Sequence, residues 1–511
     1  MPTEWVAVPA PRRGFGALPL AGVSAAALAA CAGYWAARAP FGAAGAAGEF
    51  APLHLVAVVA GLVGFAFVVR RPEWGLLALV VVLYTNSSEV AVRVYGVPSL
   101  LQMLAAAVAA GLALRLLSAP GGVGAARVVL DPLLVPLVVY AAVVLASSLV
   151  AEDAALSDER LSDCLKGLVV FLLVTNLVTT RATLRRAVWA LVLSGAFLGA
   201  VSVFQALTHA YGTELGGFGR VKLAQIVGGL REPRISGPLS DPNFYAQILA
   251  ALVPFALYRV WGERRLSLRL AALVALGLVG GALAFTYSRG GALAAGLTLG
   301  LALVDRRGGL RLVLPGAALL ALLLMSVPGQ FGGRLETLER LVPDEEEPAV
   351  VVHAESSIEQ RKLLMRTAWE MFGAHPWLGV GAGNYSEHFD EYAAHVGSAT
   401  PSYENFAERR YPHNLYLETA AETGLAGLAA FAAVVGGALL SALWAARGFR
   451  RWGAECSGAL AMSVALALVA YLASSLFLHG HYIQYLWLLV ALAAAARRVA
   501  RAESPAAAEG F

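Results

Sequence analysis

The sequence is poor in charge. Only 14% of its 511 residues are Asp, Glu, Lys or Arg, whereas 59% are hydrophobic, and the mean hydropathy is +0.68. A soluble globular protein carries about a quarter charged residues. The composition therefore excludes a soluble domain and predicts a polytopic membrane protein.

Lysine and cysteine are also scarce. The chain has three lysines, so its basic charge is almost entirely arginine, and its three cysteines lie far apart at positions 31, 164 and 456. This spacing excludes a disulfide framework and a cysteine metal site. The net charge of +4 does not indicate a nucleic-acid partner, because in a membrane protein the placement of charges matters more than their sum.

Long apolar runs are abundant instead. A membrane-spanning helix needs about 20 apolar residues, and the chain offers about 14 such segments. They lie near residues 17–36, 52–69, 75–92, 98–117, 130–150, 162–179, 185–207, 241–261, 267–286, 288–305, 309–327, 413–445, 457–477 and 481–499. The segment at 75–92 is either a span or a re-entrant helix, because the polar run Asn86–Glu89 interrupts it. We predict an all-α polytopic membrane protein with a large helical periplasmic loop.

Two polar segments divide the predicted helices into groups. N-terminal transmembrane helices occupy 1–207, central ones 241–327 and C-terminal ones 413–499; a first periplasmic loop occupies 208–240, the large periplasmic loop 328–412 and a cytoplasmic tail 500–511. The run up to Cys31 is similar to a signal peptide, although the many spans that follow favour an uncleaved first helix.

The arginines indicate the orientation. With the N-terminus in the cytoplasm, most arginines of the short loops fall on the inner side, as the positive-inside rule requires. Both long polar segments then face the periplasm. An arginine on the outer side does not serve to anchor the topology, so it is a candidate for function, although the rule is weaker for long loops.

Arg289 is the clearest candidate. It lies in TYSRGG (286–291), a turn between two apolar helices with almost no loop around it. The simple alternative is an arginine that extends to the outer headgroups. The functional interpretation is a fixed cation beside glycines that let another group approach closely.

Arg361 is the second candidate. If Ile358 to Phe372 form a helix, Arg361 falls inside its apolar face, while Lys362 and Arg366 lie on the polar flank. A buried arginine needs an anionic partner. That partner is either a carboxylate of the protein or an anionic ligand.

Arg234 precedes a predicted helix start in REPRISGPLSDPNFY (231–245), where Asp241 is a helix cap and Pro242 the first helical residue. It is either a plain surface arginine or part of the same site. Guanidinium groups from three separated segments at one membrane face suit a diphosphate, because the planar fork binds phosphate oxygens bidentately. The acidic run 344–347 is interpreted as a solvated loop, not a metal site.

The segment RRYPHNLYLETAAETG (409–424) carries His413 where an apolar helix begins. Histidine titrates near neutrality and accepts a proton from a hydroxyl. His413 is therefore either an interfacial anchor or a base for a sugar hydroxyl that attacks a phosphate-activated sugar. Glu418 and Glu422 share one helix face, and the carboxylate that points inward needs a donor.

Taken in order, these motifs resemble the O-antigen ligase/polymerase family of bacterial envelope glycan assembly. The matching features lie within roughly 230–435 and are GPLSDPNFYAQ (237–247), YSRGG (287–291), Arg361 fifteen residues before the proline of HPWLGVGAGNY (375–385), and PHNLYLETAAETGLAGLAAF (412–431). Each motif alone is weakly specific, whereas the ordered set is strongly so.

The resemblance implies a membrane glycosyltransferase in the bacterial inner (cytoplasmic) membrane with its active site facing the periplasm. Its donor would be an undecaprenyl-diphosphate-linked glycan, and its route inverting, metal-independent and without a cofactor. Family roles carry to Arg289 and Arg361 as diphosphate-binding cations and to His413 as the group acting on the acceptor hydroxyl. The further candidate substrate-binding residues are Arg234, Asn243, Arg366, Asn414 and Glu418.

The acceptor stays open at this point. A polymerase would join O-antigen or exopolysaccharide repeats, and the large outer loop, which could hold a growing chain, favours this interpretation. A ligase would transfer the glycan to lipid A-core or another acceptor. A secondary transporter or flippase is the alternative of another class, but it favours charges near the bilayer midplane and internal repeats. The expected partners are the lipid-linked donor, a glycan or lipid acceptor, and membrane lipids.

Overall fold

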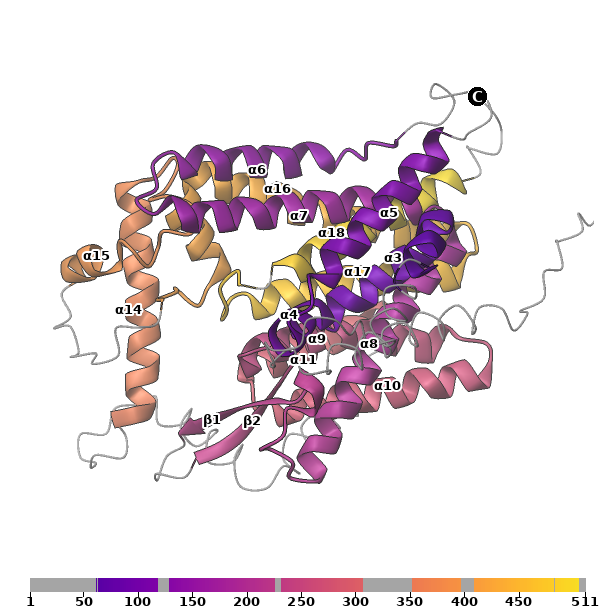
Figure 1. Ribbon diagram of the computed structural model, residues 1–511, viewed down its shortest axis with the longest axis horizontal. Coiled ribbons are helices and arrows are strands. Elements are labelled where there is room, and N and C mark those ends of the chain that lie inside the picture. Colours follow the sequence, from indigo (N-terminus) through magenta and orange to yellow (C-terminus); the bar gives the residue numbers. More distant parts are fainter. Residues whose placement is uncertain are drawn as a thin grey trace, which may run out of the picture.

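The computed structural model describes residues 61, 63–117, 128–225, 231–306, 352–396, 409–481 and 483–504, and these are mostly helical (Figure 1). The elements up to the sheet are α3 (Pro72–Tyr84), α4 (Ser87–Tyr95), α5 (Leu100–Leu117), α6 (Leu134–Ser148), α7 (Ala154–Leu177), α8 (Arg181–Leu207), η1 (Leu215–Gly217), β1 (Arg220–Gln225) and β2 (Arg231–Gly237). They are followed by α9 (Pro242–Gly262), α10 (Leu266–Phe285), α11 (Arg289–Asp305), α14 (Val352–Ala374), α15 (Phe389–His395), α16 (Leu415–Arg451), α17 (Glu455–Ser474) and α18 (Gln484–Ala502).

Six helices within these ranges are long and apolar enough to cross a membrane, namely α5, α8, α9, α10, α16 and α17. The pair α3 and α4 would add a seventh span with a bend of 65°. The bend falls at Asn86, which adopts a left-handed conformation (φ 55°), inside the predicted interruption. The predicted spans 17–36 and 309–327, most of 52–69 and the acidic run 344–347 lie outside the described residues, and the total of about 14 spans stays a prediction.

The structure is mostly helical, and it departs from the predicted all-α fold at a short hairpin in the first polar segment. Strands β1 and β2 pair antiparallel there, with Val221 opposite Ile235 and Lys222 opposite Arg234. Polar and apolar residues alternate along β1, and Gly228 and Gly229 stand between the strands in the sequence. This pattern is typical of a hairpin, and it lies within the predicted first periplasmic loop.

The core centres on α18. Its residues from Tyr485 to Ala496 are almost completely buried, and it packs against α7, α16 and α17. Five of these twelve residues are alanines, and their small side chains let neighbouring helices approach closely, as in other membrane bundles. The long helix α16 bends at Gly424 (φ 64°, ψ −164°), where a Cβ atom would lie 2.3 Å from the backbone of Trp377.

The two ends of the helix bundle differ. At one end, which we call the arginine end, arginines pair with acids of other segments: Arg450 with Asp305 of α11 (2.6 Å) and Arg497 with Asp131, which precedes α6 (2.5 Å). At the other, which we call the loop end, lie the hairpin, α14 and α15, with α14 running crosswise to α6, α7 and α16 (Figure 1). Helices α9, α11 and α16 begin at the loop end.

Helix α14 is rotated slightly from the predicted orientation. Its buried side chains are Leu364, Thr367, Ala368 and Met371, whereas Arg361 is exposed. The prediction that Arg361 lies inside the apolar face is therefore wrong. The buried stripe includes Thr367, whose hydroxyl is satisfied by donating to the Leu363 carbonyl (2.9 Å), and Arg361 lies at the edge of this stripe.

Candidate active site at the starts of three helices

Three helices present their N-terminal ends at the loop end of the bundle. Asp241 caps α9, as predicted, by accepting the N–H of Asn243 (2.7 Å). Ser288 caps α11 and Asn414 caps α16. A helix N-terminus carries partial positive charge and unpaired N–H groups, which favour an anion nearby.

Arg234 braces two of these starts. Its Nε donates to the carbonyl of Thr286 (2.9 Å), and its Nη2 donates to Oδ1 of Asn243 (2.9 Å). The strand β2 is thereby joined to the start of α9 and to the turn that precedes α11. Arg234 and Asn243 thus contact each other, and Arg234 also holds the turn.

That turn holds Arg289. The residue before the Ser288 cap is Tyr287, which has a positive φ of 50°, and Arg289 follows as the first residue of α11 with an exposed side chain. Gly291, two residues after Arg289, has a packing role: a Cβ at this position would lie 2.5 Å from the Cβ of Ala246 on α9. Close contact between the two helices is therefore what requires Gly291.

Arg361 of α14 lies close enough to Arg289 for their charges to interact. Its side chain reaches solvent, yet the protein around the guanidinium desolvates it enough to lower its pKa, and the positive charge of Arg289 lowers the pKa further while Asp241 opposes both. Asp241 in turn accepts from Lys222 Nζ (3.3 Å). We call Lys222, Arg234, Arg289 and Arg361 the cation cluster; its positive groups outnumber the carboxylate of Asp241.

His413 adjoins the cation cluster. The helix begins at Leu415, not at His413, so the histidine stands just before the Asn414 cap. The pKa of His413 is lowered to about 4; burial is the largest cause, the charges of Arg361 and Lys222 act in the same direction, and Asp241 opposes them. The charges that act on His413 are thus those of the cation cluster, and the imidazole is neutral at pH 7.

His413 also has an unusual backbone. Its φ of 49° is in the left-handed region, which costs a non-glycine residue on the order of 1 kcal/mol. Tyr287 shares this feature. Such strain gathers at functional sites, where surrounding contacts hold it.

The remaining predicted residues have different surroundings. Asn414 accepts the N–H groups of Tyr416 and Leu417 through Oδ1 (3.0 Å each) and donates to the carbonyl of Leu476 (3.1 Å). Its amide is thus committed to the helix start. Arg366 is exposed on α14, beyond Arg361.

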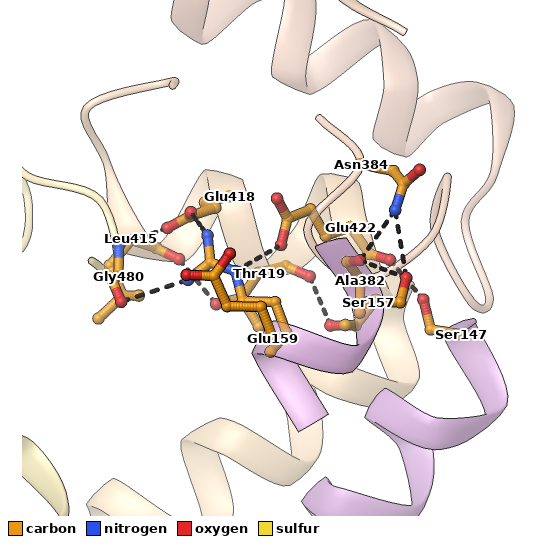
Figure 2. A network of polar contacts seen from close by, with 12 residues as sticks. Ser147, Ser157, Glu159, Ala382, Asn384, Leu415, Glu418, Thr419, Glu422 and Gly480 are labelled. Carbon is orange, nitrogen blue, oxygen red and sulfur yellow. Dashed lines mark hydrogen bonds and ion pairs between the residues drawn. The ribbon is translucent and has the colours of Figure 1, made fainter. Parts of the chain in front are cut away.

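Glu418 belongs to a buried polar network (Figure 2). Its carboxylate accepts hydrogen bonds from Arg160 Nη2 of α7 and from the N–H of Gly480 (2.6 Å). Glu422 lies 3.9 Å from Arg160 Nε, and its carbonyl accepts from Ser147 Oγ (2.6 Å). Both carboxylates point inward, and one arginine serves both.

Sequence reasoning did not identify Arg160 or His479. Arg160 counted only as an outer arginine, although its position outside the arginine-rich loops was a usable signal. His479 lies in the α17–α18 connection; its ring stacks on Tyr411 (centroids 4.0 Å) and meets His413 edge to face (5.4 Å). The histidines of LHGHY (478–482) were a visible motif, but nothing in the sequence connects them with His413.

Comparison of the sequence with known protein families gives a match in the region that holds these residues. Residues 272–432 match the family model described as O-antigen ligase. This match confirms the resemblance to the O-antigen ligase/polymerase family, and the matched segment, which is less than half of the chain, contains Arg289, Arg361 and His413. No curated protein matches the chain.

Proposed function

From this family membership and the cation cluster, we propose that the chain is a membrane glycosyltransferase. It takes a glycan from an undecaprenyl-diphosphate carrier at the periplasmic face of the inner membrane and polymerises O-antigen or exopolysaccharide repeats. The observation that supports this best is the convergence of Arg289, Arg361 and His413. They come from three separated segments at one end of the bundle, and the charge of Arg361 interacts with both Arg289 and His413.

The cations suit a diphosphate leaving group. Arg289 and Arg361 supply planar forks for phosphate oxygens, and the starts of α9, α11 and α16 add partial positive charge. The carboxylate of Asp241 is already engaged by Lys222 (3.3 Å). The cation cluster can therefore stabilise the charge that builds on the diphosphate as its bond to the sugar breaks.

The acceptor step is assigned to His413. The acceptor hydroxyl oxygen attacks the anomeric carbon on the face opposite the diphosphate, and a new glycosidic bond forms. The bond between that carbon and the diphosphate oxygen breaks, and its electron pair leaves with the diphosphate. The hydroxyl proton passes to His413, which can accept it because its imidazole is neutral. The product is inverted at the anomeric carbon, and no step needs a metal.

A purified-protein assay separates this proposal from a transporter. In detergent, with an undecaprenyl-diphosphate-linked glycan and no gradient, the glycosyltransferase releases undecaprenyl diphosphate and forms a longer or transferred glycan. A transporter moves its substrate only between compartments, so it releases none. Absence of release by a folded preparation that binds the donor would contradict the proposal.

The glycan phenotype of a gene deletion decides between the two acceptors. Single repeats still attached to their final acceptor indicate that a polymerase has been lost. Complete chains that remain on the carrier indicate that a ligase has been lost. Mass analysis of the extracted glycans distinguishes these results.

A further inference from the structure

His479 joins three separate parts of the protein at one ring. It is buried, with 9% of its surface exposed. Its imidazole lies parallel to Tyr411 (centroids 4.0 Å, planes 3° apart), edge to face with His413 (5.4 Å), and edge to face with Phe244 of α9 (4.9 Å). The ring therefore packs between the start of α9 and the residues that lead into α16.

The backbone around His479 is held from both sides. The N–H of Gly480 donates to Glu418 (2.6 Å), and its carbonyl accepts from Arg160 Nη1 (3.2 Å). On the other side, Leu415 N–H donates to the Ser475 carbonyl (3.0 Å). The buried network of Figure 2 thus holds the α17–α18 connection against the start of α16.

The ring is held by packing. Within the described residues, His479 Nδ1 is buried and has no hydrogen-bond partner. An unpaired buried Nδ1 stabilises nothing, whereas the ring contacts Tyr411, His413 and Phe244 through its faces and edge. An aromatic ring of similar size and no nitrogen would make the same contacts.

We propose that His479 is a positioning residue for His413: its ring forms the wall that keeps water from the His413 imidazole and orients it toward the acceptor hydroxyl. This inference rests on the proposed function, in which His413 receives the acceptor proton. The left-handed backbone of His413 needs such a contact, because a strained conformation persists only where its surroundings hold it.

The charges around His413 support this role. Those that face it are Arg361 from α14, Lys222 from β1 and Asp241 before α9, and burial is the largest cause of its lowered pKa. Burial also lowers the pKa of His479 well below its usual value, with His413, Arg160 and His481 acting in the same direction. Two neutral imidazoles in contact do not repel each other, so His479 can cover His413 without charge.

The test compares His479→Ala with His479→Phe. The alanine variant admits water to His413, so the pKa of His413 should rise. The fall of kcat/KM on the acid side of its pH profile, which we call the acid limb, should then move from about pH 4 toward pH 6.5. A shift of the limb to about 6 lowers the rate at pH 5 by roughly tenfold relative to the plateau. Donor affinity should not change, and His479→Phe should restore the wild-type limb.

The control is His481→Ala, which removes a histidine two positions away whose ring contacts His479 and Phe244. This variant should leave the acid limb of the kcat/KM profile at the wild-type pH. If His479→Ala folds and keeps the wild-type limb, or if the Phe variant behaves like the Ala variant, the positioning role is wrong. If instead His413→Ala retains full transfer, the assignment of His413 as the base fails. If folded wild-type protein binds the donor but transfers no glycan, the proposed function itself fails, and both results are distinguishable from failure of the positioning role.

Discussion

Arg160 of α7 and Glu418 of α16 lie 258 positions apart in the chain and form an ion pair at the loop end of the bundle. Their side chains are 21% and 3% exposed. The pair contacts the backbone of Gly480 on both its N–H and its carbonyl. It therefore connects the helix that follows His413 to the connection that carries His479.

Removing Arg160 should destabilise the protein strongly. Arg160→Met leaves Glu418 and Glu422 buried without their cation, and breaking a buried pair costs about 3–5 kcal/mol. Thermal unfolding in detergent measures the loss. The matched control is Arg93→Met, because Arg93 pairs with Glu214 at 3.0 Å with side chains 30% and 56% exposed; an exposed pair contributes about 0.2–1 kcal/mol. Equal losses in the two variants would contradict the importance of burial.

Lysine should not replace the two arginines assigned to the diphosphate. Arg289→Lys and Arg361→Lys keep the charge but lose the planar fork, so we expect folded protein whose kcat falls by on the order of 10²-fold. Arg93→Lys, at the same end but outside the cation cluster, should remain near wild type. Turnover close to normal in both cluster variants would refute a bidentate diphosphate site.

The rate should stay high under mildly acidic conditions. Burial lowers the pKa of His413 to about 4, so the imidazole remains an available base well below pH 6.5. The acid limb of kcat/KM, which reports the free enzyme, is expected near pH 4 and should disappear in His413→Gln. A limb near 6.5 would mean that His413 is solvated or is not the base.

The lowered pKa of His413 also makes the stability of the folded protein depend on pH. Between about pH 4 and 6.5 the unfolded chain binds a proton at His413 that the folded protein does not. Stability from this group therefore falls as pH decreases through that window. The His413→Gln variant should therefore lose less stability than the wild type when the pH falls from 7 to 5. Unfolding measured at both pH values checks this.

The predicted orientation can be tested with an impermeant thiol reagent. Glu370 is exposed on α14 at the loop end, and Cys456 is exposed near the arginine end. In a Cys31→Ala background, Glu370→Cys should react in intact spheroplasts, whereas Cys456 should react only after lysis. The reverse pattern would place the loop end in the cytoplasm and rule out a periplasmic site.

Local sequence patterns predicted much of the helical framework. Apolar runs mark α5, α8, α9, α10 and α17 to within a few residues, because each must be covered by lipid or by other helices. The Asp241 cap was predictable because capping depends on neighbouring residues. The bend at Asn86 was predictable for the same reason, since a polar run interrupts an apolar one.

Long-range partners could not be predicted in the same way. The sequence indicated that Glu418 or Glu422 needs a donor, but only the packing of α7 against α16 identifies it as Arg160. The exposure of Arg361 depends on which face of α14 packs against α16, and the periodicity of the helix did not specify that face closely enough. His479 reaches His413 only because the α17–α18 connection folds back onto the start of α16, a contact that no local pattern specifies.

The most direct test of the central claim is single-turnover transfer by His413→Ala, with donor affinity measured separately. If His413 receives the acceptor proton, the rate of the chemical step should fall by about 10²–10⁴-fold while the donor still binds as in wild type. His413→Gln, which keeps a hydrogen-bonding group, should retain more activity than the alanine variant. Loss of donor binding with an intact chemical step would instead make His413 a diphosphate ligand and contradict its assignment as the base.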